Sequence, residues 1–149
     1  MDFPITELMD DQASAEWIEQ HFHPDGFRCP HCQASVDHAY VFRATAKSQL
    51  TVYRCRRCQG IYNLYSGTVF EARHLRPAQV VLLIRGVLKG ESSATLAREL
   101  AMSRTTATEL RHLLQANAEH HQLDTPLVDN VVEADEIFQN AGEKRRGTL

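Results

Sequence analysis

The sequence lacks the features that place a protein in or across a membrane. No apolar run approaches the roughly 18 to 20 residues that a bilayer-spanning helix needs. Residues 1–11 are acidic and do not have the basic and then apolar order of a secretory signal peptide. We therefore expect a cytoplasmic protein that does not bind a membrane and whose thiols stay reduced.

Basic residues are also missing from the first part of the chain. Residues 1–27 carry seven Asp or Glu and no Lys or Arg, whereas residues 28–112 carry thirteen Lys or Arg against five acids, a net of +8. Residues 113–149 have three basic and seven acidic residues, a net of −4. The basic middle attracts polyanions, of which nucleic acid is the commonest. A solvated surface without a partner remains the alternative from charge alone.

Cysteine is scarce, and its four residues form two close pairs. The pattern is Cys29-Pro-His-Cys32, a gap of 22 residues (33–54), and then Cys55-Arg-Arg-Cys58. Each C-x-x-C turn points both thiolates at one position, and two such turns complete the closed tetrahedral S4 shell of structural Zn²⁺. The alternatives are a rubredoxin-like iron site, and redox chemistry at one pair, although no thioredoxin-type βαβ unit is visible. His31 and His38 are expected to be surface residues, because four cysteines already complete the shell.

Short elements are expected on both sides of the first cysteines. Residues 11–22 predict a helix capped by Asp10 or Asp11, with an apolar stripe that serves packing. Residues 39–42 and 50–53 are β-prone and predict a hairpin, and residues 61–64 would add a third strand.

Three helices are expected after this ribbon. Pro77 suits the first turn of a helix that ends at Lys89 and Gly90, and this ending favours a helix over a buried strand despite the β-branched residues between them. Two further helices, at about residues 92–100 and 103–118, are separated by a tight turn.

The last two helices have the spacing of a helix-turn-helix. Ala97 is small where the helices would cross, Ala101 stands at the turn where Gly is usual, and Ser103 caps the second helix. The shared core is expected to be Leu96, Leu100, Ala107 and Leu110, extended by Leu113 and Leu114.

The exposed face of the second helix would then meet DNA. It presents polar residues that reach phosphates and base edges in a major groove: Arg104, Thr105, Thr108 and Arg111. A trihelical unit without DNA contact is the alternative.

Basic and aromatic residues flank the second cysteine pair. The arginines are Arg54, Arg56 and Arg57, and the tyrosines nearby are Tyr53, Tyr62 and Tyr65. On a small rigid ribbon such residues would grip phosphates and stack on bases. The equal alternative is that the tyrosines fill the small core and the arginines are solvated.

Residues 131–138 predict an acidic strand. Alternation puts Glu133 and Asp135 on one face and Glu136 on the other. A carboxylate among apolar neighbours should be paired or should bind a cation, although edge strands often carry acids without a further role.

Along nearly its whole length the sequence resembles the N-terminal part of insertion-sequence transposases of the ISXO type. The matching segments are His23-Pro-Asp-Gly26, Cys29-Pro-His-Cys32, Tyr53-Arg-Cys55-Arg-Arg-Cys58, Ser66-Gly-Thr-Val-Phe70, Leu96-Ala-Arg-Glu-Leu100, Val132-Glu-Ala-Asp-Glu136 and Gln139-Asn-Ala-Gly-Glu-Lys144. The C-x-x-C pairs are generic, but their ordered combination with Glu-Ala-Asp-Glu is far more specific.

The resemblance implies a role for Asp135. Such transposases have a zinc ribbon, a helix-turn-helix and a DDE catalytic domain of ribonuclease-H-like fold, and Asp135 matches the first acid of the DDE set. In the complete catalytic domain these acids hold two Mg²⁺ ions for strand transfer. The chain stops 14 residues after Asp135, so we expect an incomplete catalytic domain that does not cut DNA alone.

Together these observations predict an α+β protein in several parts. The expected divisions are an N-terminal helix (1–27), a zinc ribbon (28–68), a trihelical helix-turn-helix (69–121), and a linker with the first strand of a truncated DDE domain (122–149). The expected function is recognition of the terminal inverted repeats of an element, on double-stranded DNA, with homodimerisation left open. The alternatives are a stand-alone zinc-ribbon transcriptional regulator, and an interaction protein whose ribbon contacts other proteins.

Overall fold

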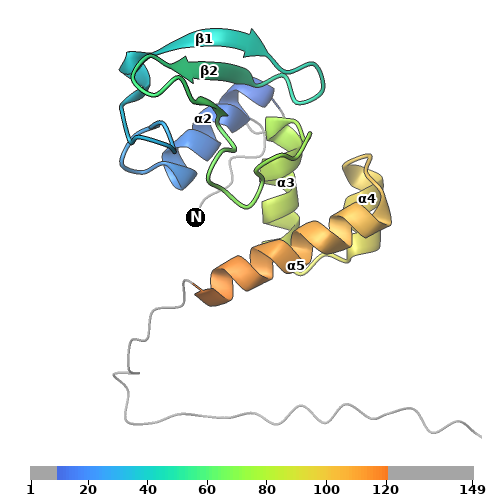
Figure 1. Ribbon diagram of the computed structural model, residues 1–149. Helices are drawn as coiled ribbons and strands as arrows, with labels where there is room; N and C mark the ends of the chain where they lie inside the picture. The colour runs from blue at the N-terminus through green and yellow to red at the C-terminus, as the bar shows by residue number, and fades with distance from the viewer. Residues whose placement is uncertain (1–9, 121–149) are drawn as a thin grey trace, which may run out of the picture.

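The computed structural model describes residues 10–120, which form an α+β molecule (Figure 1). In chain order its elements are helix α2 (Asp11–Phe22), the 3-10 helix η1 (Val36–His38), strands β1 (Ala39–Ala44), β2 (Thr51–Cys55) and β3 (Ile61–Asn63), and helices α3 (Pro77–Leu88), α4 (Ser93–Glu99) and α5 (Arg104–His120). The sheet lies at one end of the molecule and α4 and α5 lie at the other, with α3 between them. The strand expected at residues 131–138 lies outside the described residues.

Helix α2 begins and packs as its sequence predicts. The side chain of Asp10 accepts a hydrogen bond of 3.0 Å from the backbone N–H of Ala13, which satisfies one free donor of the first turn. Trp17 and Ile18 are buried, so the apolar face of the helix packs into the core. The prediction that this helix serves packing is confirmed.

The three strands form an antiparallel sheet in the order β1-β2-β3. The hairpin between β1 and β2 pairs Ala39 with Cys55 and Ala44 with Thr51, and the register shifts between Val41 and Arg43. In the connecting loop the Thr45 hydroxyl accepts a 2.9 Å hydrogen bond from the N–H of Leu50. Every residue of β1 after the first is exposed, so this edge strand depends on its hydrogen bonds to β2.

Helix α3 joins the ribbon to the last two helices. Pro77 is its first residue, and Gly90 follows it with φ of +76°, the left-handed conformation that commonly ends a helix. Val80, Val81 and Leu83 are almost completely buried. The helix prediction is therefore confirmed, since tertiary burial stabilises β-branched residues whose own preference is for strands.

A tight turn separates α4 from α5. The hydroxyl groups of Ser92 and Ser103 cap the two helices by accepting hydrogen bonds from the N–H groups of Thr95 (3.1 Å) and Thr106 (3.0 Å). Ala101 has φ of +52°, as expected of a turn position that usually holds Gly. The helices lie where the sequence predicts them.

Most of the apolar residues expected between α4 and α5 are buried. Leu96, Leu100, Ala107 and Leu110 are each less than a tenth exposed, and Leu114 packs against them. Leu113 is 39% exposed, so its predicted place in this core is wrong. Whether a side chain on a helix is buried depends on where the neighbouring helices lie, and these leave Leu113 uncovered.

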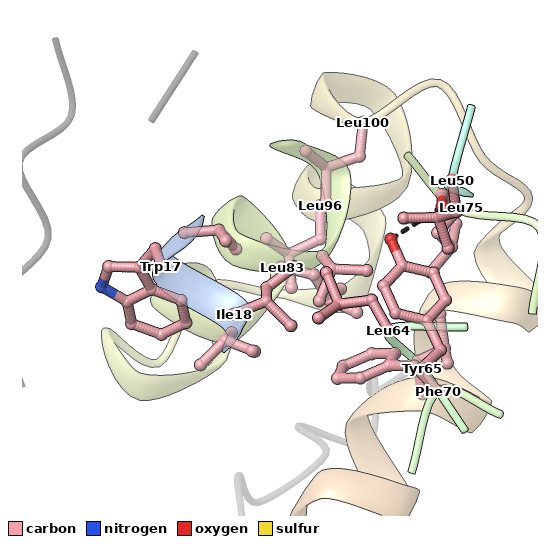
Figure 2. Close-up of a cluster of buried hydrophobic side chains, with 14 residues drawn as sticks. Trp17, Ile18, Leu50, Leu64, Tyr65, Phe70, Leu75, Leu83, Leu96 and Leu100 are labelled. Carbon is pink, nitrogen blue, oxygen red and sulfur yellow. Dashed lines mark hydrogen bonds between the residues drawn. The ribbon is translucent and has the colours of Figure 1, made fainter. Parts of the chain in front are cut away.

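One hydrophobic core connects the ribbon to all the long helices (Figure 2). It contains Trp17 and Ile18 from α2, residues from α3, Leu96 and Leu110 from the last two helices, and Leu100 between them. The remaining members come from the chain after β1 and β3: Leu50, Leu64, Tyr65, Phe70 and Leu75. The ribbon is thus held against the helices by continuous apolar packing.

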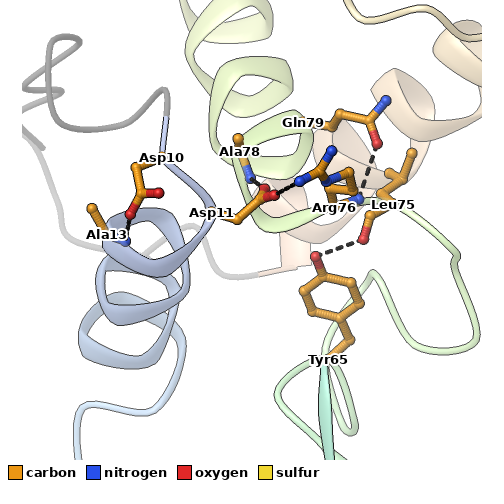
Figure 3. A network of polar contacts seen from close by, with 8 residues as sticks. All are labelled: Asp10, Asp11, Ala13, Tyr65, Leu75, Arg76, Ala78 and Gln79. Atoms are coloured by element: carbon orange, nitrogen blue, oxygen red, sulfur yellow. Dashed lines mark hydrogen bonds and ion pairs between the residues drawn. The ribbon is translucent and has the colours of Figure 1, made fainter. Parts of the chain in front are cut away.

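Polar contacts fasten α2 to the start of α3 (Figure 3). The carboxylate of Asp11 accepts a hydrogen bond of 3.1 Å from the N–H of Ala78 and forms an ion pair with Arg76. The hydroxyl of Tyr65 donates a 2.9 Å hydrogen bond to the carbonyl of Leu75 in the same region. These contacts fix the angle at which α3 leaves the ribbon.

Within residues 10–120, no helix combines the length and the apolar character needed to cross a membrane.

Candidate metal centre and nucleic-acid interface

The two C-x-x-C turns have nearly the same backbone geometry. Gln33 and Gln59, which follow the second cysteine of each pair, have φ of 60° and 61°, and their N–H groups donate 2.9 Å hydrogen bonds to Cys29 and Cys55 respectively. The N–H groups of Cys29 and Cys55 in turn donate 2.9 Å hydrogen bonds to Ala34 and Gly60. This repeated turn aims both cysteines of a pair in the same direction.

The four sulfur atoms converge from these two turns. All lie within 4.8 Å of one another, with Cys29 Sγ 3.5 Å from Cys58 Sγ and Cys32 Sγ 3.6 Å from Cys55 Sγ. A tetrahedral Zn²⁺ with Zn–S bonds of about 2.3 Å requires sulfur atoms about 3.8 Å apart. All four cysteines are free, because these separations are far longer than the roughly 2.05 Å of a disulfide. The four-cysteine cluster therefore fits structural zinc.

The protein environment gives two of the thiols different pKa values. The backbone N–H of Cys58 is the main cause that lowers the pKa of Cys55 from 9.0 to about 7. For Cys58 itself, the N–H of Gly60 lowers the pKa, but burial and hydrogen bonding with the other three thiols raise it to about 12. The thiolate is the form that binds a metal, so Zn²⁺ has to displace a proton from Cys58 at neutral pH.

A small aromatic core supports the cluster from one side. Phe27 and Tyr62 are buried with Cys29 and Cys55, and the Phe27 and Tyr62 rings lie 5.3 Å apart. Burial is the main cause that raises the pKa of Tyr62 to about 12, and the charges of nearby thiolates add to it. So few buried residues cannot stabilise a ribbon alone, which agrees with a fold that depends on metal binding.

Of the tyrosines beside the second pair, Tyr53 and Tyr62 belong to this packing, and Tyr65 lies in the core shared with the helices. Tyr62 and Tyr65 are 2% and 1% exposed, and half-buried Tyr53 lies 5.6 Å from the Phe27 ring. Of the two roles open to these residues, Tyr62 and Tyr65 therefore fill the core and do not stack on bases.

The three arginines beside the second pair lie near the surface. Arg56 and Arg57 are exposed and line a surface pocket with His38, whereas Arg54 is half-buried. The guanidinium of Arg54 lies 5.6 Å from the ring centre of Phe42, and that of Arg56 lies 5.9 Å from the ring centre of Tyr40. The sequence prediction included neither Tyr40 nor Phe42. Their alternation on a strand was a signal, but only the register shows which residues they face.

The candidate residues on α5 fall into two groups. Arg104 and Thr105 are exposed, and half-buried Thr108 donates a 2.9 Å hydrogen bond to the carbonyl of Arg104. Arg111 is half-buried and donates hydrogen bonds to the Ser93 hydroxyl (3.0 Å) and to the carbonyl of Glu91. Arg111 thus ties α5 to the start of α4, while Arg104 and Thr105 stay available to a ligand.

Two histidines near the cysteines are not part of the cluster. His31 and His38 are exposed, as expected, and the cluster of metal-binding side chains among residues 10–120 consists of the four cysteines. Asp135, the acid that the resemblance singles out, lies outside the described residues.

Comparison with protein families identifies the ribbon. Residues 9–60 match the family model described as a transposase zinc-ribbon domain. This segment of the chain is a transposase zinc ribbon. It contains all four cysteines together with α2, β1 and β2. No curated protein and no solved structure matches the chain. The domain implies a DNA-binding role associated with transposases, and the matched segment ends before α3.

Proposed function

We propose that this protein is the DNA-binding portion of a DDE-type insertion-sequence transposase, and that it recognises the terminal inverted repeats of its element. The observation that carries the proposal is the match of residues 9–60 to the transposase zinc ribbon, with its four cysteines converged. The proposal treats α4 and α5 as a helix-turn-helix and Asp135 as the first acid of a Mg²⁺-binding DDE site. Asp135 lies outside the described residues, so the ribbon and α5 provide the support for this function.

The length of α5 and the residues of its first turn support this role. A helix of 17 residues is about 25 Å long, and its diameter suits the major groove of B-DNA. Arg104 and Thr105 occupy its first turn, which is the part of a recognition helix that contacts base edges. Arg111 donates its hydrogen bonds within the protein, so its contribution here is to hold α5 against α4.

The ribbon supports the same role through phosphate contacts. Arg56 and Arg57 are exposed beside a metal-stabilised turn, which keeps their backbone in one position. Cations in fixed positions neutralise phosphates and orient a protein on a duplex without reading its sequence. In this arrangement α5 supplies specificity and the ribbon adds affinity through charge.

The test uses the zinc-loaded full chain and duplex fragments from both sides of its gene. Footprinting should protect an inverted repeat, and the affinity should fall steeply between about 50 and 200 mM salt. Arg104→Gln should weaken binding to the repeat by about tenfold, the lower range of a base contact, and should relax its specificity. Lys89→Gln removes an exposed charge at the end of α3 and serves as the matched control.

Two results would contradict the proposal. Absence of any salt-sensitive duplex affinity would leave a ribbon that contacts other proteins. Specific protection of a promoter without flanking inverted repeats would favour a stand-alone transcriptional regulator.

A further inference from the structure

We propose that the outer face of the ribbon sheet binds unpaired nucleotides, with bases stacked on Tyr40 and Phe42 and phosphates held by Arg54 and Arg56. This inference rests on the proposed DNA-binding function, but it concerns a different ligand and a surface distant in sequence from α5. We call this surface, formed by Tyr40, Phe42, Arg54, Arg56 and Ile61, the aromatic face.

Strand register places these residues on one side of the sheet. Tyr40 pairs with Arg54 in β2, and Arg54 pairs with Ile61 in β3, so the three lie in a row across the strands. Phe42 joins them because its ring lies beneath the guanidinium of Arg54. Val41 pairs with Tyr53, which packs in the ribbon core, and therefore lies on the opposite side.

The apolar members of this face are unusually accessible. Tyr40, Phe42 and Ile61 are 39%, 44% and 46% exposed, and they make up half of the exposed large hydrophobic residues among residues 10–120. Apolar residues gathered on one surface indicate a binding site more strongly than the same residues scattered singly. Arg54 and Arg56 lie over one part of the two rings, and the exposed remainder is available to a ligand that presents flat apolar surface.

Basic residues outnumber acids around the aromatic face, where Asp37 of η1 is the acid next to β1. Residues 38–70 contain Arg43, Lys47, Arg54, Arg56 and Arg57 and no Asp or Glu. The ion pairs of the described part of the chain lie elsewhere, between Arg73 and Glu109 and between Arg76 and Asp11. A cationic surface is complementary to a polyanion.

Unpaired nucleotides satisfy both properties of this face. Each base has an aromatic surface that stacks on Tyr or Phe in any sequence, and each phosphate supplies acceptors for guanidinium groups. Sheets that carry exposed aromatic residues bind single strands in this way in other nucleic-acid-binding domains. Bases inside a duplex are already stacked and expose only their edges, so two rings on a sheet match separated strands. The aromatic face would thus hold DNA where its strands are open, next to duplex bound by α5.

The test compares three substitutions to threonine, which preserves strand propensity. Tyr40→Thr/Phe42→Thr removes both rings, and Val41→Thr changes the residue between them on the opposite side. Binding of the zinc-loaded full chain is measured by fluorescence anisotropy with an oligothymidine strand, an abasic strand of the same length and a blunt duplex. Zinc content and circular dichroism establish that each variant is folded.

The two rings should create a preference for strands that carry bases over abasic strands. Wild type and Val41→Thr should bind oligothymidine at least about tenfold more tightly than the abasic strand, and the double variant should lose this preference. Duplex affinity should change by less than about twofold in both variants, because charge dominates there.

Other outcomes would overturn the inference or separate it from the proposed function. Equal affinity of wild type for the oligothymidine and abasic strands would overturn it, as would a double variant that binds oligothymidine like wild type. If wild type and Val41→Thr self-associate and the double variant does not, while strand binding stays intact, the face would be assigned to a second copy of the chain. Loss of specific duplex binding together with retained base stacking would refute only the proposed function.

Discussion

Several turns in this protein have residues other than glycine in the left-handed region of φ. Gln33 and Gln59 adopt it after the two cysteine turns, and their side-chain amides donate hydrogen bonds of 3.5 and 3.2 Å to Pro30 and Arg56. Those hydrogen bonds within each turn offset part of the steric cost that a Cβ atom brings. Ala101 has the same conformation, with φ of +52°, and its methyl side chain cannot form such a bond.

At this scale we expect Ala101→Gly to stabilise the protein. Glycine relieves the left-handed strain at the turn, and we expect a gain in the free energy of unfolding of about 0.5–1 kcal/mol. Ala116→Gly is the matched control, because it places glycine in the exposed interior of α5 and should cost about 1 kcal/mol. Urea unfolding followed by circular dichroism measures both changes, and a shift of the same sign in both would contradict the prediction.

Helix α3 packs tightly against Leu96 of α4 at a glycine. A Cβ atom added at Gly86 would lie 2.2 Å from Cδ2 of Leu96, which is buried in the core, and 3.2 Å from Oε2 of Glu91. The Nε2 of Gln79 on α3 also donates a 2.7 Å hydrogen bond to the carbonyl of Leu100. These contacts hold α4 and α5 at one angle to the ribbon.

Gly86→Ala should therefore destabilise the protein. Helix propensity alone would favour alanine by about 1 kcal/mol, but overpacking against Leu96 should outweigh it and leave a net loss of about 1–3 kcal/mol. Adding Leu96→Val removes the clashing group, so the double variant should lose less than the sum of the single changes. Chemical unfolding of all three variants measures this coupling; a more stable Gly86→Ala protein would contradict the close packing.

The whole molecule combines a metal-dependent ribbon with a hydrophobic core. The ribbon's own buried cluster is small, yet Leu50, Leu64 and Tyr65 extend from its strands and loops into the core of the helices. Zinc binding contributes on the order of 10 kcal/mol in zinc-finger peptides, so it is expected to dominate the stability of the ribbon. Loss of the metal should also lower the stability of the helices, because they share a core with the ribbon.

At this scale, zinc affinity should rise with pH, because protons compete for the thiolates. Cys55, whose pKa is lowered to about 7, is already ionised at higher pH, whereas Cys58, with a pKa raised to about 12, has to lose its proton. The affinity should therefore fall more steeply with acidification below about pH 7, where Cys55 also takes up a proton. Zinc transfer to a chromophoric chelator at several pH values measures this slope.

A variant of one ligand and a variant of a neighbouring residue provide the controls for that experiment. Cys29→Ser should abolish stoichiometric zinc and unfold the ribbon, whereas His31→Ala, an exposed neighbour outside the cluster, should bind zinc like wild type. Zinc affinity independent of pH, or an intact fold in reduced protein without bound metal, would contradict a structural thiolate site.

Local sequence determined the metal site and the elements of this protein. The C-x-x-C spacing specifies a tight turn whatever surrounds it, and Asp10, Ser92, Ser103 and Pro77 act on backbone groups within one turn of their own position. The four ligands, the hairpin and the order of the helices could therefore be predicted. The assignment of α5 as a DNA-recognition helix stays a prediction.

Which side chains face the solvent depends on tertiary packing. Tyr62 is buried while Tyr40 is exposed, and Arg111 binds Glu91 and Ser93 while Arg104 stays free of them. These differences depend on strand register and on which helix covers which face, and both arise from contacts between residues distant in sequence. Composition shows that arginines and aromatic residues are present, but packing determines which of them a ligand can reach.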